Sequence, residues 1–336
     1  MNAARLIKRV ITLAVVASVC LAAWFIYWAT TSLPLRQAPL EFSLKAGSSL
    51  RSVARQMTEA GVLREPWRFE LLTRLFGESA NVKAGVYEIE QPLSPYALLH
   101  KITSGDYTQI AVTIVEGWTF RQLRQVLDQQ SALAHRTQGL SETDIMQQLG
   151  ADTATSPEGW FFPETYYVGA GEADLRVLRR SYRLMQEHLA REWKLRDPGL
   201  PLGAPYEALI LASIVEKETG RPEDRAMVAA VFINRLKRGM RLQTDPTVIY
   251  GLGENFDGNL RKRDLASDHP YNTYTRAGMP PTPIAMPGLA SLRATLHPAP
   301  SDALYFVAKG DGTSQFSRTL EEHERAVSRW QRSGRR

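Results

Sequence analysis

The hydrophobic and polar positions divide the chain into an apolar N-terminal run and a longer part with alternating helical and strand periods. Residues 10–28 carry no charge and are close to the length that a helix needs to cross a bilayer core. Basic residues precede this run (Arg5, Lys8 and Arg9), and none follows until Arg36. The positive-inside rule therefore predicts that the N-terminus stays in the cytoplasm and that the rest of the chain is exported.

A cleaved signal peptide is the main alternative to a membrane anchor for this run. A signal peptide has a shorter apolar core and small residues at its cleavage site, whereas this run ends in bulky aromatic residues. A lipoprotein signal needs a small residue before its cysteine, but Val19 precedes Cys20. We therefore expect an uncleaved single-pass anchor over residues 1–30, followed by a proline-containing linker over residues 31–40.

Residues 41–155 are predicted to form one or two small α+β modules. Strand periods at 42–44 and 85–89 alternate with three helical periods, and these helices begin at capping serines or at a proline. The stretch 112–127 repeats the order of strand, glycine turn, capping threonine and helix. Such units resemble the LysM-type modules that bind the sugar backbone of cell walls, although a plain α+β spacer explains the pattern equally well.

A second domain is predicted over residues 156–330, with a mixed α/β pattern. It opens with five aromatic residues within Glu158–Tyr167, interrupted by glycine and proline. These rings would either stack on sugars or form a buried wedge, and Glu164 among them is a candidate substrate-binding residue. An amphipathic helix over 175–195 and a largely apolar helix over 206–219 follow. The fold class predicted for the whole exported chain is α+β.

Two glutamates, Glu216 and Glu218, stand near the C-terminal end of the predicted helix 206–219. The helix dipole disfavours their ionised form there, and partial burial adds to this effect, so the pKa of a glutamate rises toward that of a general acid. Two residues along a helix correspond to roughly 200° of rotation, so the pair cannot share one cleft. Spacing alone does not choose between them, and two surface charges on a frayed helix end would show the same pattern.

Polar side chains gather in two later loops. The first contains Gln243, Thr244 and Asp245, which suit hydrogen bonds to the acetamido and hydroxyl groups of sugars. Asp245 alternatively caps the helix that starts at Pro246. The second loop combines aromatic faces with amide and hydroxyl groups, and a purely structural loop is the alternative there. Its candidate substrate-binding residues are Tyr271, Asn272, Thr273 and Tyr274.

Composition and charge argue against other classes of function. The 336-residue chain has a net charge of +6 and a pI near 9.4, but its basic residues are spread out, so nucleic-acid binding is not expected. The six histidines are scattered without paired ligand spacing, and the single cysteine, Cys20, lies in the apolar run. We expect no metal, no cofactor and no disulfide.

Several long strings carry a resemblance to one known family. In order, they are EGWFFPETYY, LASIVEKETG, VAAVFINRLKRGMRLQTDPTVIYG, YNTYTRAGMPPTPIAMPGLASLRATLHP and LYFVAKGDGTSQFS. From about residue 42 to 324 the chain is similar to the endolytic murein transglycosylase family, of the MltG or YceG type. In that family the catalytic acid is the second glutamate of the EKET string, which corresponds to Glu218. Glu218 followed by Thr219 also resembles the Glu-Ser motif of lysozyme-like lytic transglycosylases.

The resemblance implies an endolytic lytic transglycosylase with a lysozyme-like active site. It would cleave the β-1,4 bond between N-acetylmuramic acid and N-acetylglucosamine in nascent peptidoglycan, leave 1,6-anhydromuramyl ends and terminate glycan strand elongation. It would lie in the cell inner membrane with its catalytic domain in the periplasm, and penicillin-binding proteins or other peptidoglycan glycosyltransferases are the partners expected of the family. The alternatives are a hydrolytic muramidase and a non-catalytic peptidoglycan-binding scaffold.

Overall fold

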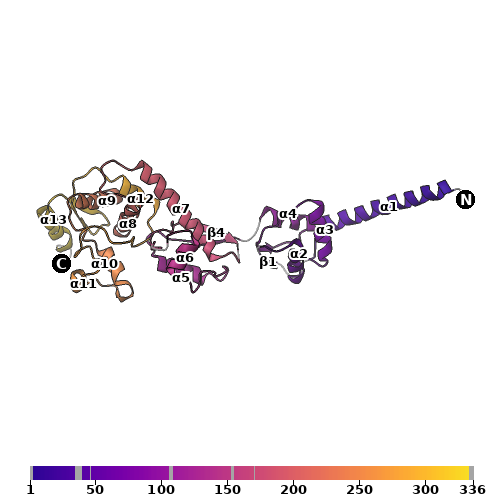
Figure 1. Cartoon of the computed structure of the whole chain (residues 1–336), viewed down its shortest axis with the longest axis horizontal. Coiled ribbons are helices and arrows are strands. Elements are labelled where there is room, and N and C mark those ends of the chain that lie inside the picture. Colours follow the sequence, from indigo (N-terminus) through magenta and orange to yellow (C-terminus); the bar gives the residue numbers. More distant parts are fainter. Residues whose placement is uncertain are drawn as a thin grey trace. The chain divides into compact units, whose positions relative to one another are not determined.

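The computed structural model describes residues 3–34, 40–45, 47–105, 109–152, 155–169 and 171–332 (Figure 1). The chain divides into two compact units. The smaller contains residues 1–111, 131–134 and 167–173, and the larger contains residues 112–130, 135–166 and 174–336. Most of the stretch after residue 111 that the sequence pattern groups with the N-terminal module therefore belongs to the larger unit. The mixture of helices and short strands confirms a chain of mixed α and β structure.

The smaller unit consists of one long helix and a compact α+β module. Its elements are α1 (Ala3–Thr30), β1 (Leu40–Leu44), α2 (Leu50–Glu59), α3 (Pro66–Leu75), β2 (Gly85–Ile89) and α4 (Pro95–Ser104). Strands β1 and β2 pair antiparallel with Phe42 opposite Tyr87, and these two rings stack at 5.4 Å. Ser49 and Ser94 cap α2 and α4 through their side chains, which confirms the predicted helix starts.

The larger unit is mostly helical. Its helices are α5 (Phe120–Gln129), α6 (Glu142–Gln148), α7 (Asp174–Leu195), α8 (Pro205–Glu218), α9 (Pro222–Lys237), α10 (Asp245–Leu252), α11 (Lys262–Ala266), α12 (Leu289–Leu296) and α13 (Leu320–Val327), with short helical turns at Gly253–Asn255 and Ser328–Arg332. Strands β5 (Tyr305–Ala308) and β6 (Ser314–Ser317) pair antiparallel. Strands β3 (Gln109–Thr113) and β4 (Thr165–Gly169) pair with each other, and residues 109–111 and 167–169 of these two strands belong to the smaller unit. The helices predicted over 175–195 and 206–219 are confirmed within one residue at each end.

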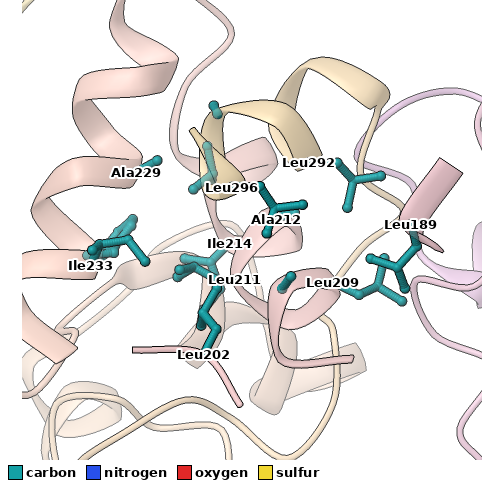
Figure 2. Close-up of a cluster of buried hydrophobic side chains, with 14 of the residues drawn as sticks. Leu189, Leu202, Leu209, Leu211, Ala212, Ile214, Ala229, Ile233, Leu292 and Leu296 are labelled. Atoms are coloured by element: carbon teal, nitrogen blue, oxygen red, sulfur yellow. The ribbon is translucent and has the colours of Figure 1, made fainter. Parts of the chain in front are cut away.

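The core of the larger unit is built around α8 (Figure 2). Every side chain from Ala208 to Val215 is buried, so α8 is a central helix, as its apolar pattern predicts. Figure 2 shows this helix among buried side chains of α7 at Leu189, of α9 at Ile233 and of α12 at Leu292. Because a close-packed core deforms little, these three helices fix the position of the carboxylates at the end of α8.

The aromatic cluster after Glu158 forms part of the core. Phe161 and Tyr166 are no more than 4% exposed. Phe161 stacks on Phe120 of α5 at a centroid distance of 5.1 Å, and the partly buried Trp160 stacks on Tyr206 of α8 at 5.7 Å. These rings therefore join α5 and α8 as a buried wedge, whereas Tyr167, the fifth aromatic residue of the cluster, is 56% exposed.

Candidate active site

Glu218 is the last residue of α8, and its position follows from the way this helix ends. Thr219 leaves the helical conformation at φ −141°, and Gly220 follows it, so the helix stops directly after Glu218. The carbonyl end of a helix carries a partial negative charge, which disfavours an ionised carboxylate beside it. The local sequence thus places an acid where its proton is held more tightly.

The carboxyl group of Glu218 is influenced by one hydroxyl, one carboxylate and one cation. Thr244 Oγ1 donates a hydrogen bond to Glu218 Oε1. Burial has the largest effect and raises the pKa of Glu218 above its ordinary value. The negative charge of Asp245 also raises this pKa. The hydrogen bond from Thr244 and the positive charge of Arg235 lower it. A carboxyl whose pKa is raised in this way keeps its proton to a higher pH, as a general acid must.

Hydrogen bonds join the turn before α10 to the 271–274 loop, next to Glu218. The N–H of Thr244 donates to Thr273 Oγ1 at 3.1 Å, and Thr273 Oγ1 lies 2.9 Å from Thr247 Oγ1. Thr247 Oγ1 in turn donates to the Thr244 carbonyl at 2.8 Å. Gln243 donates its N–H to the Thr273 carbonyl at 3.1 Å and has a positive φ of 49°, which is strained for a residue other than glycine. These contacts hold Thr244 with its hydroxyl directed at Glu218.

Asp245 does not cap α10. The helix begins at Asp245 itself, its N-cap residue is Thr244, and no side chain makes a capping hydrogen bond. The Asp245 carboxylate instead accepts a hydrogen bond from the Tyr274 hydroxyl, with 2.5 Å between Oδ1 and the phenol oxygen. The capping alternative is therefore wrong, because a contact with a distant loop takes the place of the local one. Asp245 is exposed and places a negative charge near Glu218.

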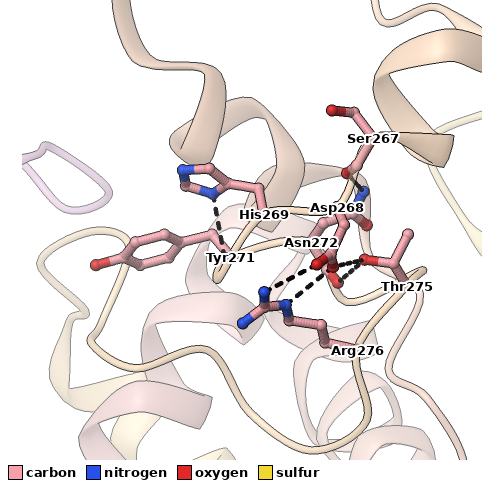
Figure 3. A network of polar contacts seen from close by, with 7 residues as sticks. All are labelled: Ser267, Asp268, His269, Tyr271, Asn272, Thr275 and Arg276. Atoms are coloured by element: carbon pink, nitrogen blue, oxygen red, sulfur yellow. Dashed lines mark hydrogen bonds and ion pairs between the residues drawn. The ribbon is translucent and has the colours of Figure 1, made fainter.

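Asn272 and Thr273 are both buried. The Thr273 polar groups bond to the turn before α10, whereas the Asn272 side chain bonds within its own part of the chain (Figure 3). Asn272 Nδ2 donates to the carbonyls of three residues between 264 and 267, and Asn272 Oδ1 accepts from the N–H of Tyr274 at 2.9 Å. The ion pair between Arg276 and Asp268, at 2.9 Å, closes the same loop. Asn272 therefore shapes the loop and Thr273 connects it to the turn before α10, whereas Tyr271 and Tyr274 are only partly buried.

A buried arginine on α9 supports the site, and the sequence pattern did not reveal it. Arg235 is 8% exposed and donates from Nε to the Leu304 carbonyl and from Nη1 to the Leu242 carbonyl, both at 2.7 Å. These two carbonyls fix a positive charge that acts on Glu218. In the sequence Arg235 is one of two arginines on this helix, and a buried position cannot be told from a solvated one by charge alone.

Glu216 points to the other side of α8 and is tied into the core. Glu216 Oε2 accepts a hydrogen bond from the N–H of Gly288 at 2.9 Å, and Oε1 lies 3.9 Å from Arg225 Nη2. The side chains of Glu216 and Arg225 are only 8% and 11% exposed. Burial and the charge of Glu216 raise the pKa of the nearby Glu116. Glu216 is thus a charged anchor for α12, which begins directly after Gly288.

Glu164 does not belong to the Glu218 cluster. It is exposed and lines a groove together with Glu116, His188, Arg225 and Arg293. The interactions that reach the Glu218 carboxyl come from Thr244, Asp245 and Arg235. Of the binding residues predicted from sequence, the structure therefore brings residues 243–245 and the 271–274 loop to the end of α8, and it leaves Glu164 apart.

Glu158 is a buried carboxyl that sequence reasoning did not single out. It is 4% exposed, accepts from the N–H of Phe120 at the start of α5, and accepts from the Tyr250 hydroxyl of α10, both at 3.0 Å. Burial raises the pKa of Glu158 to about 7, against the effect of these hydrogen bonds. Glu158 therefore ties α5 to α10, the helix that opens with Asp245.

The groups gathered around Glu218 suit an uncharged polar substrate. They comprise a proton-holding carboxyl, an exposed carboxylate, hydroxyl groups and partly buried aromatic rings. Within the described part of the chain, no three or more His, Cys, Asp or Glu side chains are grouped so that they could hold a metal ion. The arrangement can donate a proton, stabilise a developing positive charge and hydrogen-bond to hydroxyl and amide groups.

Known proteins resemble this chain across both units. A model described as the YceG-like family matches residues 42–329. An endolytic murein transglycosylase of Bacillus subtilis (strain 168) is 30% identical over 307 residues, which cover 87% of this chain and 84% of that protein. Another, of Streptococcus pneumoniae, is 26% identical over 315 residues, which cover 84% of this chain and 56% of that protein. The crystal structure of a YceG-like protein from Listeria monocytogenes matches with a TM-score of 0.52 and 28% identity over 85% of this chain and 98% of that one.

Proposed function

Because the chain belongs to the YceG-like family, we propose that it is an endolytic murein transglycosylase whose catalytic acid is Glu218. The resemblance seen in the sequence is confirmed at the level of the family. The observation that supports Glu218 most strongly is its carboxyl at the end of a buried helix, with a raised pKa and a hydrogen bond from Thr244. The substrate is then peptidoglycan, and the enzyme is a lyase that acts on its glycan strands.

The proposed reaction uses Glu218 twice. The Glu218 carboxyl first gives its proton to the oxygen of the β-1,4 bond between N-acetylmuramic acid and N-acetylglucosamine, and the bond from that oxygen to C1 of muramic acid breaks. The resulting carboxylate then takes the proton of the C6 hydroxyl of the same muramic acid, and O6 forms a bond to C1. The products are a 1,6-anhydromuramyl end and a free hydroxyl on the leaving sugar, and Glu218 has regained its proton.

A single catalytic carboxylate suffices for this chemistry because the sugar supplies its own nucleophile, whereas an ordinary glycosidase needs a pair. Asp245 is then assigned to the stabilisation of positive charge at C1, and its hydrogen bond from Tyr274 holds it in place. A hydrolytic muramidase is the second candidate, since the same Asp245 could activate a water. Gln243, Tyr271 and Tyr274 are proposed to contact the sugars. Thr244, Asn272 and Thr273 are buried and are proposed to support Glu218 and the loop behind these contacts.

The place of action is proposed to be the inner membrane. Residues Val10–Thr30 of α1 are long and apolar enough to cross a bilayer. With the N-terminus in the cytoplasm, the α+β module that follows α1 and the larger unit would face the periplasm. The enzyme would then cut nascent strands close to the membrane and terminate their elongation. For the module of β1, α2, α3 and β2 we propose LysM-like sugar binding, supported by its strand, helix, helix, strand order. Peptidoglycan glycosyltransferases are the proposed partners.

The nature of the new glycan ends tests the proposed reaction. Purified full-length protein in detergent would be incubated with unlabelled glycan strands, and the products would be analysed by mass spectrometry. We expect ends that have lost water as 1,6-anhydromuramic acid, from cuts within the strands. Reducing muramic acid ends that incorporate oxygen from ¹⁸O-labelled water would instead identify a hydrolase, and an absence of cleavage would leave only a wall-binding role.

A further inference from the structure

One face of the smaller unit exposes large apolar side chains. Along α3, Trp67, Leu71 and Leu75 follow one another at intervals of four residues, so they share one face of the helix. Phe76 comes next in the chain, and its ring lies 5.2 Å from that of Tyr96 at the start of α4. Each of these five side chains, called here the α3 stripe, exposes between 41% and 66% of its surface. A contiguous exposed set of this kind marks an interaction surface.

The α3 stripe adjoins the C-terminal end of α1. The Arg68 guanidinium carbon lies 4.5 Å from the ring centre of Trp24, 5.9 Å from that of Trp28 and 5.5 Å from that of Trp67. Ala29 is buried in the core of the module, and Trp28 packs against that core. The module is thus fixed to the end of the apolar span that α1 provides, at the depth where interfacial aromatic residues lie in a bilayer.

We propose that the α3 stripe inserts into the interfacial layer of the phospholipid bilayer, beside α1. This inference rests on the proposed membrane anchoring and adds a second membrane contact to it. Helix α3 has the character of an interfacial helix, because Phe69 and Leu72 are buried in the module while the stripe faces outward. Arg64 and Arg74 are exposed at the two ends of this helix, where they suit phosphate head groups.

A membrane-seated module restricts where the enzyme works. A single helical anchor allows the attached module to rotate and to lift from the surface, whereas a second contact on α3 fixes one of its faces against the lipid. The proposed sugar-binding module would then meet glycan strands at the membrane surface, where they are still attached to lipid. The α3 stripe thereby favours nascent strands over strands that have left the membrane.

The depth of the α3 stripe can be measured with a fluorophore on single cysteines. Full-length protein with Cys20→Ser would receive Leu71→Cys or Leu75→Cys, and Glu88→Cys on β2, also exposed, would be the matched control. Each cysteine would carry the environment-sensitive dye NBD in phosphatidylethanolamine and phosphatidylglycerol vesicles. The quencher lipids would carry a shallow acyl-chain quencher for positions 71, 75 and 88 and a deep one for Cys20, which lies at the middle of the proposed span. The native Cys20, labelled in the unsubstituted protein, reports separately on the insertion of α1.

We expect the labels at positions 71 and 75 to be quenched several-fold more than the label at position 88. Quenching at Cys20 with positions 71 and 75 as unquenched as position 88 would overturn the α3 contact and leave the anchor intact. An unquenched label at Cys20 would overturn the anchor and the α3 contact together. Labels at 71 and 75 that are shielded from water yet unquenched would identify a protein as the occupant and would also overturn the proposal.

Activity gives a second readout. The double variant Leu71→Glu with Leu75→Glu should lose several-fold more activity on lipid-linked strands in vesicles than on detached strands. An equal loss on both substrates would assign the stripe a structural role and overturn the proposal. Since Glu218 is unchanged in this variant, activity on detached strands tests the proposed function separately.

Discussion

Glu216 and Glu218 are two residues apart on α8, yet one meets Gly288 and Arg225 and the other meets Thr244 and Asp245. On the first face, the carboxylate accepts a hydrogen bond from a backbone N–H and lies 3.9 Å from a guanidinium. On the second face, burial and a neighbouring carboxylate favour the protonated form. Two glutamates therefore have different roles: Glu216 contributes to stability and Glu218 to catalysis. The difference comes from the residues that surround each carboxyl group.

The largest expected effect is a difference in activity between variants of Glu218 and of Glu216. Glu218→Gln should lower kcat by about 10²- to 10⁴-fold, the usual contribution of a general acid, because the amide cannot give a proton. The matched control, Glu216→Gln, should keep most of its activity. Release of soluble fragments from labelled peptidoglycan measures both, and an active Glu218→Gln beside an inactive Glu216→Gln would reverse the assignment.

The effects on stability should be reversed: Glu216→Gln should destabilise the fold more than Glu218→Gln. Glu216→Gln should lower the free energy of unfolding by about 1–3 kcal/mol, because Arg225 loses a counter-charge in a buried position. The pKa of Glu218 is higher in the folded chain than in the unfolded chain, so the folded state loses stability as the pH rises through that pKa. Glu218→Gln should therefore be at least as stable as the unsubstituted protein at neutral pH. Urea unfolding followed by circular dichroism tests both statements, and a destabilised Glu218→Gln would contradict the second.

The Thr244 hydroxyl should lower the pKa of Glu218. Its hydrogen bond favours the charged form of Glu218, so Thr244→Val should raise the pKa of Glu218 and move the alkaline limb of the kcat/KM profile to higher pH. The loss of this contact should also cost about tenfold or less in rate. Thr244→Ser keeps the hydroxyl and serves as the control. If the alkaline limb stays in place in both variants, the Thr244 hydroxyl does not influence the pKa of Glu218.

The smallest expected shift of the pH profile concerns Asp245. Its negative charge raises the pKa of Glu218, so Asp245→Asn should move the alkaline limb to lower pH, opposite to Thr244→Val. Tyr274→Phe removes the hydroxyl that contacts Asp245 but keeps the carboxylate, and the limb should move less in that control. A shift of the Asp245→Asn limb to higher pH would contradict the proposed electrostatic role.

Local signals in the sequence located most helices and strands. Capping serines and helical periods placed α2 and α4, and the apolar run 206–219 placed α8, because these features depend on neighbouring residues alone. The choice of Glu218 over Glu216 came from resemblance to a family. The helical period shows that the two side chains diverge, but it does not show what each of them meets.

By itself, the sequence determined the apolar N-terminal run, the order of the elements, the central burial of α8 and the presence of an acid at its end. Only the tertiary structure decided that Thr244, 26 residues away along the chain, directs its hydroxyl at Glu218, that Asp245 bonds to Tyr274 and that Glu164 lies elsewhere. Capping and periodicity act over a few residues, whereas the proton affinity of Glu218 is set by burial and charges that distant segments bring together.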